Sequence, residues 1–336
     1  NVIPGWSFNG TVWYVTSGEN ISLPENGHGL QLGPNGTINQ TFRSTGSYDY
    51  VLTFTLAPSR ENCANNFTAV NVSGPGTSEV FFFKESLGKE SWQTYGFSLG
   101  SRENRRGLMS LQIQSVATDS RSNTSCWPIV DTLLINGIQN PRMYSVGPAF
   151  IDNSSQGILL EADSNNDPSN FVKSPLQDWI ILGTVKYIDS KHFATPRGRA
   201  AVELVSGNPS GILTNVFFLR HGQVTLDFIM GDANDSCVGD FTVFLQVGNT
   251  IWNFTMRSIG LGSREKHSVT FKAEFSDSDS VPISFVSFNE TRTSDHQVLC
   301  GPVIDSTKIW FSNGKQLGNK LVTFSFVFVT TFLFMA

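Results

Sequence analysis

The sequence predicts an all-β protein built from two tandem β-sandwich domains, and three observations lead to this fold class. Short apolar or alternating runs bounded by Gly, Pro, Asn and Ser recur along the chain, as expected for strands joined by turns. A long internal repeat divides the 336 residues into two similar halves. Charged residues make up only 15% of the chain, against a usual value of about 25%, which favours extensive apolar cores.

The repeat is carried by aromatic and apolar positions at a constant spacing. Trp6 and Trp179 are 173 positions apart, and the same spacing relates Tyr14 to Tyr187. Because each tryptophan occupies the same place in its copy, we expect both to lie in the cores rather than to serve as sugar platforms. Asp131 and Asp305 are likewise duplicated, which indicates a shared structural role at a turn.

The cysteines follow the repeat. Cys63 and Cys126 are 63 positions apart, and so are Cys237 and Cys300. Four cysteines allow three pairings, but only Cys63–Cys126 and Cys237–Cys300 give two separately folding copies the same bridge. Two disulfides indicate an oxidising, extracellular compartment.

The repeat places a first domain at residues 1–140 and a second at 147–311, with a linker near residues 136–146, where Gly, Asn and Pro cluster. The second copy has a lead-in segment before its tryptophan, whereas the first begins five residues before Trp6. We therefore expect the first strand of domain one to be missing from this sequence, which would leave a sheet edge unpaired.

Eleven Asn-x-Ser/Thr sequons indicate a glycosylated extracellular surface. Their asparagines are Asn9, Asn20, Asn35, Asn39, Asn66, Asn71, Asn123, Asn153, Asn234, Asn253 and Asn289.

The C-terminal segment has the pattern of a GPI-attachment signal. Residues 321–336 form an uncharged apolar tail shorter than a bilayer span, preceded by a polar spacer and by small residues. Ser312, Asn313 and Gly314 are the candidate attachment sites, and residues 312–336 would be the signal. We expect contact with a membrane only through this anchor.

The net charge of −5 and the scattered Lys and Arg residues exclude a nucleic-acid-binding class, which needs a basic patch.

Several motifs resemble one family of plant proteins. They are Gly183-Thr184-Val185-Lys186-Tyr187-Ile188-Asp189-Ser190, the cysteine loop Gly231-Asp232-Ala233-Asn234-Asp235-Ser236-Cys237-Val238-Gly239, and Cys300-Gly301-Pro302-Val303-Ile304-Asp305. The chain up to its tail resembles the cell-wall proteins grouped as domain of unknown function 642. Domain one departs from the pattern, with Trp127 in place of a glycine after its second cysteine.

This resemblance implies two tandem galactose-binding-like sandwiches of the jelly-roll type, secreted to the apoplast. It also implies association with wall polysaccharide, pectin or cellulose, and with pectin methylesterase, and an effect on pectin esterification and wall remodelling. Two other functions stay open beside this binding role: a carbohydrate-active enzyme, and a purely structural adhesion protein at the cell surface.

The candidates for catalysis are poorly supported, and we expect no enzymatic activity. Gly96-Phe97-Ser98-Leu99-Gly100 matches the nucleophile-elbow pattern, but a polar turn and a further strand follow it instead of a helix. Glu203 and Asp189 are the acids most suited to glycoside hydrolysis. Glu203, however, alternates with Val202 and Leu204, which predicts that it points outward from a strand.

Ligand contacts are assigned to aromatic and histidine positions that lack a counterpart in the other copy. His192, Trp252 and Trp92 are the named candidates, with Trp127 and Trp310 as further unpaired aromatics. No histidine or cysteine has metal-ligand spacing, so no cofactor is expected. A structural Ca²⁺ held by Asp232, Asp235 and Asp240 is the one metal site considered.

Overall fold

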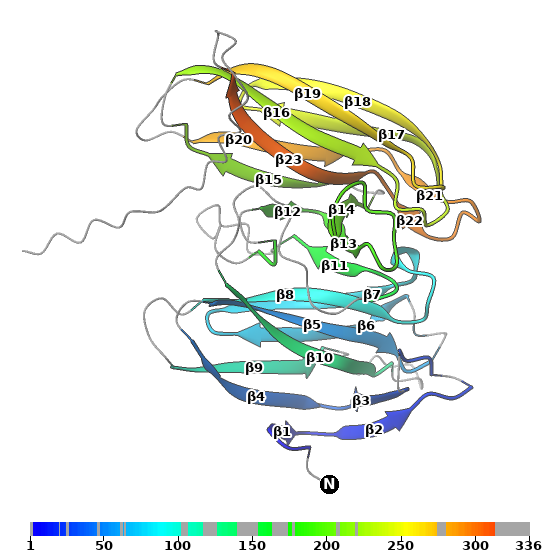
Figure 1. The fold of residues 1–336 in the computed structure, drawn as a ribbon. Coiled ribbons are helices and arrows are strands. Elements are labelled where there is room, and N and C mark those ends of the chain that lie inside the picture. The colour runs from blue at the N-terminus through cyan, green and yellow to red at the C-terminus, as the bar shows by residue number, and fades with distance from the viewer. Residues whose placement is uncertain are drawn as a thin grey trace, which may run out of the picture.

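The computed structural model describes residues 3–312, except residues 20, 25–26, 46–47, 61–62, 64, 102–106, 117–125, 140–153, 163–173, 177–178, 206–208, 219–220 and 274–279. In these parts the chain is almost entirely β-strand and forms two β-sandwiches stacked along the long axis of the molecule (Figure 1). The predicted tandem all-β fold is therefore confirmed.

The first sandwich contains strands β1–β10 and the 3-10 turn η2 (Glu85–Leu87). One layer has the strand order β1-β4-β9-β6-β7 and the other the order β8-β5-β10-β3-β2. The strands are β1 (Trp6–Asn9), β2 (Val12–Thr16), β3 (His28–Leu32), β4 (Thr37–Ser44), β5 (Tyr48–Pro58), β6 (Asn65–Gly74), β7 (Thr77–Lys84), β8 (Gln93–Ser101), β9 (Gly107–Ser115) and β10 (Pro128–Gln139). Between the layers lies an aromatic core that includes Phe54, Phe81 and Tyr95.

The second sandwich contains strands β11–β23. Its layers have the orders β19-β16-β23-β14-β13-β11 and β12-β15-β20-β17-β21-β22, with β18 paired to β17. The strands are β11 (Ile158–Glu161), β12 (Ile180–Leu182), β13 (Thr184–Asp189), β14 (Ala200–Leu204), β15 (Ser210–Val216), β16 (Gly222–Gly231), β17 (Cys237–Val247), β18 (Thr250–Ile259), β19 (Arg264–Ala273), β20 (Val281–Ser287), β21 (Thr291–Thr293), β22 (Leu299–Cys300) and β23 (Val303–Ser312). Trp179 is buried in its core beside Phe285, as predicted from the repeat, and Trp6 packs half-buried against the first core.

One layer of each sandwich joins the other in a single eleven-stranded sheet. Strand β11 of domain two pairs antiparallel with β13 and parallel with β8 of domain one, with Ile158 opposite Thr94 and Leu159 opposite Tyr95. Gly96 on β8 permits this approach, because a Cβ atom there would lie 2.6 Å from a methyl group of Leu160. The domains thus share backbone hydrogen bonds as well as a linker.

Side chains also cross the junction. Val51 and Ile138 of domain one pack into the core cluster of domain two, while Leu159 and Val205 of domain two pack into the cluster of domain one. Since each core is completed by residues of the other domain, the junction is a packed interface.

Matching glycines show that the repeat extends to the backbone. Gly10 and Gly183 both adopt φ of +64°, and a Cβ atom at either would collide with a backbone oxygen, that of Asn35 at 2.1 Å or that of Pro209 at 2.3 Å. Only glycine fits this backbone conformation and this approach.

Asp131 and Asp305 each precede an irregularity in the pairing of their strand. Thr132 and Ser306, which follow them, have positive φ angles of 48° and 53°, and register shifts occur at or beside both positions. The Asp131 carboxylate accepts a hydrogen bond from the Thr132 amide at 2.6 Å. The duplicated acids therefore stabilise paired β-bulges, a structural role like the one predicted.

One local expectation is corrected. Asn136–Gln139 do not form a linker: they continue β10 and pair with β5, because Ile138 is buried in the core cluster. The expected unpaired edge of domain one lies at β2: no described strand pairs with its outer side, whereas the equivalent strand β13 is covered by β11. Trp13 and Tyr14 on this open edge strand are exposed.

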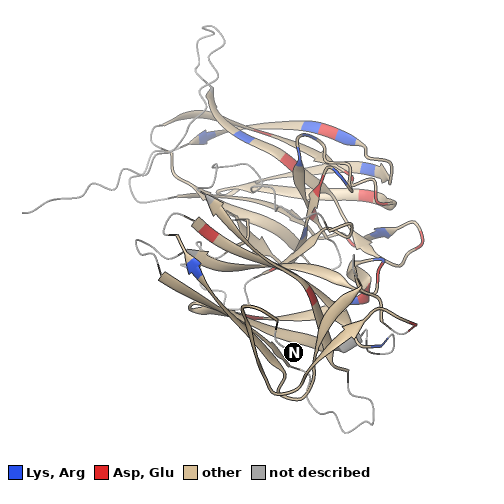
Figure 2. Cartoon of the chain, turned by 60° about the horizontal axis from the view of Figure 1, so that its bottom comes forward, with Lys and Arg blue, Asp and Glu red and all other residues tan. Residues whose placement is uncertain are grey.

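Charges of both signs are interspersed along the strands in the view of Figure 2, without a basic patch. Within the described ranges, no helix has the length and apolar character required to cross a membrane. The predicted GPI signal after Ser312 lies outside the described residues, so it stays a prediction.

Candidate functional site

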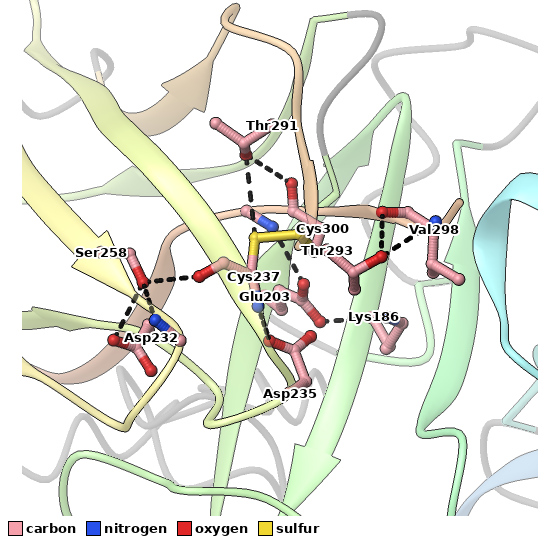
Figure 3. Close-up of a disulfide and its surroundings, with 12 residues drawn as sticks. Lys186, Glu203, Asp232, Asp235, Cys237, Ser258, Thr291, Thr293, Val298 and Cys300 are labelled. Carbon is pink, nitrogen blue, oxygen red and sulfur yellow. Dashed lines mark hydrogen bonds and ion pairs between the residues drawn. A yellow bond between two sulfur atoms is a disulfide. The ribbon is translucent and has the colours of Figure 1, made fainter. Parts of the chain in front are cut away.

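Several loops meet at one end of domain two around the disulfide Cys237–Cys300, whose Cα atoms are 5.8 Å apart (Figure 3). The equivalent bridge in domain one is Cys63–Cys126. Both disulfides have the predicted pairing. The second bridge ties the start of β17 to β22, and thereby fixes the loops on either side of it.

Asp232 holds two of these loops together. Its buried carboxylate accepts hydrogen bonds from the Ser258 hydroxyl at 3.0 Å, from the amide and hydroxyl of Ser263 at 2.9 and 2.6 Å, and from the amides of Asn234 and Gly262. Burial alone would raise the pKa of this carboxyl, but the hydrogen bonds outweigh burial and lower the pKa below its usual value. Asp232 is therefore ionised, and its carboxylate has a structural role in joining these loops.

A buried ion pair between Lys186 on β13 and Glu203 on β14 lies beside the disulfide. Its side chains point away from the core of domain two, toward which the neighbouring residues of both strands point. Lys186 Nζ is 3.2 Å from Glu203 Oε2, and the Gly301 amide donates to Glu203 Oε1 at 2.9 Å. Burial is the main influence on Glu203 and raises its pKa to about 7, although Lys186 acts in the opposite direction. Near neutral pH this carboxyl is thus poised between its two protonation states.

Segments from both domains meet near this pair. A Cβ atom on Gly157 would lie 2.8 Å from the stem of Lys186, so this glycine lets the backbone pack on the lysine. From domain one, Lys89 donates through Nζ to the Asp235 carbonyl at 3.3 Å and through its amide to Gln156. Glu203 was predicted to point outward, but the face that it occupies is covered, and its side chain is fully buried.

An open groove of about 660 Å³ lies near the disulfide, which it adjoins through Thr291. Its lining residues come from the start of β17 and from the segment 288–296; they are Val238, Gly239, Asp240, Phe288, Asn289, Glu290, Thr291, Arg292 and His296. Phe288 is 54% exposed and presents its ring to solvent.

The polar side chains of the groove are partly preorganised. Arg292 donates through Nε to Glu290 at 2.6 Å and through Nη1 to the Gln297 carbonyl at 3.3 Å. The side-chain amide of Asn289 donates to the Thr242 hydroxyl at 3.0 Å, and the buried Thr291 hydroxyl donates to the Cys300 carbonyl at 2.7 Å. A groove with fixed hydrogen-bonding groups and an exposed ring is suited to a polar ligand that has one apolar face.

The three ligand candidates named from the sequence do not line this groove. Trp92 is buried with Ala57 and Ile129, so it belongs to the packing of domain one and the prediction is wrong. Trp252 faces inward on β18 and packs against the core of domain two, which also removes it from the outer surface. His192 lies in the turn after β13, with Nδ1 3.3 Å from a carboxylate oxygen of Asp189.

The residues weighed for catalysis are engaged in structure. Glu203 is enclosed with Lys186, and Asp189 accepts hydrogen bonds from the Lys191 amide as well as contacting His192. Ser98 is a buried residue inside β8 and accepts a hydrogen bond from the Gly100 amide at 3.3 Å. A strand interior is not the strand-to-helix turn that a nucleophile elbow requires.

The three aspartates considered for Ca²⁺ serve different contacts. The Asp232 carboxylate is surrounded by donors, Asp235 accepts from the Cys237 amide at 3.1 Å, and Asp240 is exposed 4.0 Å from Arg257. No group of three His, Cys, Asp or Glu side chains among the described residues could hold a metal ion. The Ca²⁺ site stays an untested expectation.

The predicted sequon asparagines whose side chains are described lie at the surface. Asn9, Asn35, Asn234, Asn253 and Asn289 are exposed, and Asn39 and Asn71 are half-buried. Asn20, Asn123 and Asn153 lie outside the described residues, as does the side chain of Asn66.

Comparison with known proteins identifies relatives along most of the chain. A model of the family described as "Protein of unknown function (DUF642)" matches residues 1–136 and 161–310. The Arabidopsis thaliana protein named "Protein DUF642 L-GALACTONO-1,4-LACTONE-RESPONSIVE GENE 2" is 28% identical over 325 residues, which cover 91% of this chain and 84% of the relative. Protein TEEBE of the same plant is 29% identical over 327 residues, which cover 92% and 84%.

Solved structures show only a distant likeness. The tandem CBM22 domains of Paenibacillus barcinonensis Xyn10C share 11% identity, with 93% of this chain and 94% of that chain covered and a TM-score of 0.29. The extracellular domain of ANXUR1 from Arabidopsis thaliana shares 9% identity, with 90% and 88% covered and a TM-score of 0.31. Because the family model matches both sandwiches, the chain belongs to the family of domain of unknown function 642.

Proposed function

We propose that this chain is a non-catalytic extracellular protein of the plant cell wall that binds wall polysaccharide in the groove between β17 and the segment 288–296. The observation that carries the proposal is the groove itself, where the exposed ring of Phe288 lies beside Arg292, whose guanidinium is already held in place. An aromatic ring can stack on the C–H face of a sugar while fixed polar groups bind its hydroxyls. Polysaccharide can enter this groove only in chains whose Asn289, which also lines it, carries no glycan.

The charge of the groove favours a partly esterified pectin over a fully acidic one. Arg292 is paired with Glu290, and the further carboxylate of Asp240 lines the groove, while the whole chain carries a net charge of −5. These carboxylates oppose a densely charged polyanion, whereas methyl esters remove that repulsion. Neutral cellulose would lack a carboxylate for Arg292.

Association with pectin methylesterase is the second part of the proposal. It is supported by the resemblance to the wall-protein family rather than by a particular surface of this chain. A protein that holds esterified pectin and its esterase together would raise their local concentration and so modulate esterification. Co-precipitation of the purified chain with a plant pectin methylesterase tests this part separately.

Secretion is supported by the two disulfides and by the surface position of the described sequon asparagines. A GPI anchor attached near Ser312–Gly314 would hold the protein at the outer face of the plasma membrane. Release of the native protein by a phosphatidylinositol-specific phospholipase tests the anchor.

Calorimetric titration with pectin oligosaccharides of low and high methyl esterification tests the groove. We expect Phe288→Ala and Arg292→Ala each to weaken binding about tenfold, because each removes a central contact. Phe82→Ala and Lys191→Ala serve as matched controls, since these exposed residues lie outside the groove, and they should bind as wild type does. Equal binding by all four variants would remove the groove from the proposal, and saturable binding by none of the proteins would favour the adhesion role.

A further inference from the structure

The hairpin of β17 and β18 carries a glycosylation sequon on its outer surface. The sequon is Asn253-Phe254-Thr255, in the middle of β18. Phe254 and Trp252 pack toward the core, whereas Asn253 and Thr255 are exposed on the other side. Strand alternation therefore directs a glycan on Asn253 across the outer face of the sheet.

An aromatic side chain lies directly opposite this asparagine. The register of the hairpin pairs Asn253 with Phe244, and residues opposite each other have Cβ atoms about 4.5–5.5 Å apart on one face. Phe244 is half-buried, and the ring of Phe288 meets it edge-on with a centroid distance of 5.4 Å. Phe288 thus fixes a ring that sits within reach of the first sugar on Asn253.

The other sequons in paired strands lack this arrangement. Asn9 lies opposite Thr37, Asn39 opposite Ser7 and Gln112, and Asn71 opposite Val80 and Gln114. Among the sequon asparagines whose strand register is described, Asn253 is therefore the one that faces an aromatic ring.

We propose that Asn253 is glycosylated and that its first N-acetylglucosamine packs on the ring of Phe244. The sugar offers a face of C–H bonds, which is attracted to the negative face of an aromatic ring and removes apolar area from water. The glycan is then a structural part of the outer face of β17 and β18. On one side along the hairpin the neighbouring pairs on that face, Thr242 with Thr255 and Asp240 with Arg257, are polar, while on the other side Gln246 faces the exposed Ile251. Phe244 is therefore the aromatic side chain directly opposite Asn253.

The occupant is the chain's own glycan rather than a protein partner. A sequon in the centre of a surface places a bulky, hydrated chain there, and such a chain would hold a partner protein away. This inference does not rest on the proposed polysaccharide groove, since Phe244 does not line it and Phe288, which does, serves here only as a packing partner of Phe244.

The test combines glycopeptide mass spectrometry with thermal unfolding of the full chain, secreted from a eukaryotic host that leaves high-mannose glycans. Thr255→Ala removes the sequon, Phe244→Leu removes the ring, and the double variant combines them. We expect occupancy at Asn253, and we expect Thr255→Ala to lower Tm by about 2 °C in the wild-type background and by less than half as much in the Phe244→Leu background. Trimming wild-type glycans to a single N-acetylglucosamine should leave Tm nearly unchanged.

Thr41→Ala is the matched control, because it removes the sequon of Asn39, which faces no aromatic ring. It should shift Tm equally with or without the Phe244 ring. An unoccupied Asn253, or equal Tm shifts for Thr255→Ala in both backgrounds, would overturn the proposal. If Phe244→Leu does not fold, NMR of the wild-type protein with its glycans trimmed to one N-acetylglucosamine decides the question. The C–H protons of the sugar on Asn253 should show the upfield chemical shift that a nearby aromatic ring causes. The absence of that shift would contradict the contact.

Discussion

Glu203 is ionisable, fully buried and paired with Lys186, and this combination makes stability depend on pH. Its pKa is about 7 in the folded chain and near 4.5 in the unfolded one, so between these values the folded state binds more protons. Stability contributed by the protonated carboxyl is therefore full below about pH 4.5 and is lost as pH rises through about 7.

We predict that Glu203→Gln flattens the pH dependence of unfolding. In urea titrations, the wild-type free energy of unfolding should be lower at pH 8 than at pH 5, and the part of this difference due to Glu203 should be on the order of 1–3 kcal/mol. The variant should lose most of that difference, because glutamine does not titrate. Asp240→Asn is the control, since Asp240 is exposed and should leave the slope unchanged. An unchanged slope in Glu203→Gln would contradict the assigned pKa.

The roles of individual residues were harder to predict from the sequence than the fold was. Alternation along β14 identified the face on which Glu203 lies, but not the loops of both domains that bury it. Trp92 and Trp252 were selected for lacking a counterpart, and both turned out to pack inside. The absence of a counterpart marks a difference between the domains, and at these two positions the difference lies in the packing.

Phe288 and Arg292 were missed for a related reason. Neither belongs to a dense motif, and the groove is formed only when segment 288–296 returns to the start of β17. A signal did exist in Phe288-Asn289-Glu290-Thr291, where an aromatic residue precedes a sequon and so indicates exposure.

At the scale of elements, the turn between β12 and β13 depends on one glycine. Gly183 combines a φ of +64° with an approach to the Pro209 backbone, and Gly10 repeats both features in domain one. The two glycines are 173 residues apart, the same spacing that relates Trp6 to Trp179, and the backbone shows why this position must be glycine in both copies.

We predict that Gly183→Ala destabilises the chain by about 2–4 kcal/mol, because it adds both a strained φ and a collision with backbone. Gly198→Ala is the matched control: its φ is +88°, but a Cβ atom there would meet nothing within 4 Å. The control should therefore lose only about 1 kcal/mol from the backbone strain. Chemical denaturation compares the two, and equal losses would contradict the role of the close approach.

The whole molecule is held together by strand β11, which belongs to the sheets of both domains at once. Shared core residues and the ion pair between Lys84 and Glu161, at 3.2 Å, add to this junction. The number of domains, their class and both disulfides were predictable because they follow from local patterns and from the repeat. The joint sheet was not, because a parallel pairing between β8 and β11 leaves no trace in either local pattern.

We predict a single cooperative unfolding transition for the full chain with its disulfides intact. Because each core contains side chains of the other domain, neither sandwich can unfold without exposing apolar surface of its neighbour. Differential scanning calorimetry should give equal calorimetric and van't Hoff enthalpies. Two resolved transitions would show that the junction contributes little to stability.

Hydrogen–deuterium exchange with and without partly esterified pectin oligosaccharides tests the central claim, that polysaccharide binds in the groove. The account predicts slower exchange in peptides covering residues 237–242 and 288–297, and little change in β2 or in β23. Protection confined to those other strands, or no protection at saturating oligosaccharide, would contradict it.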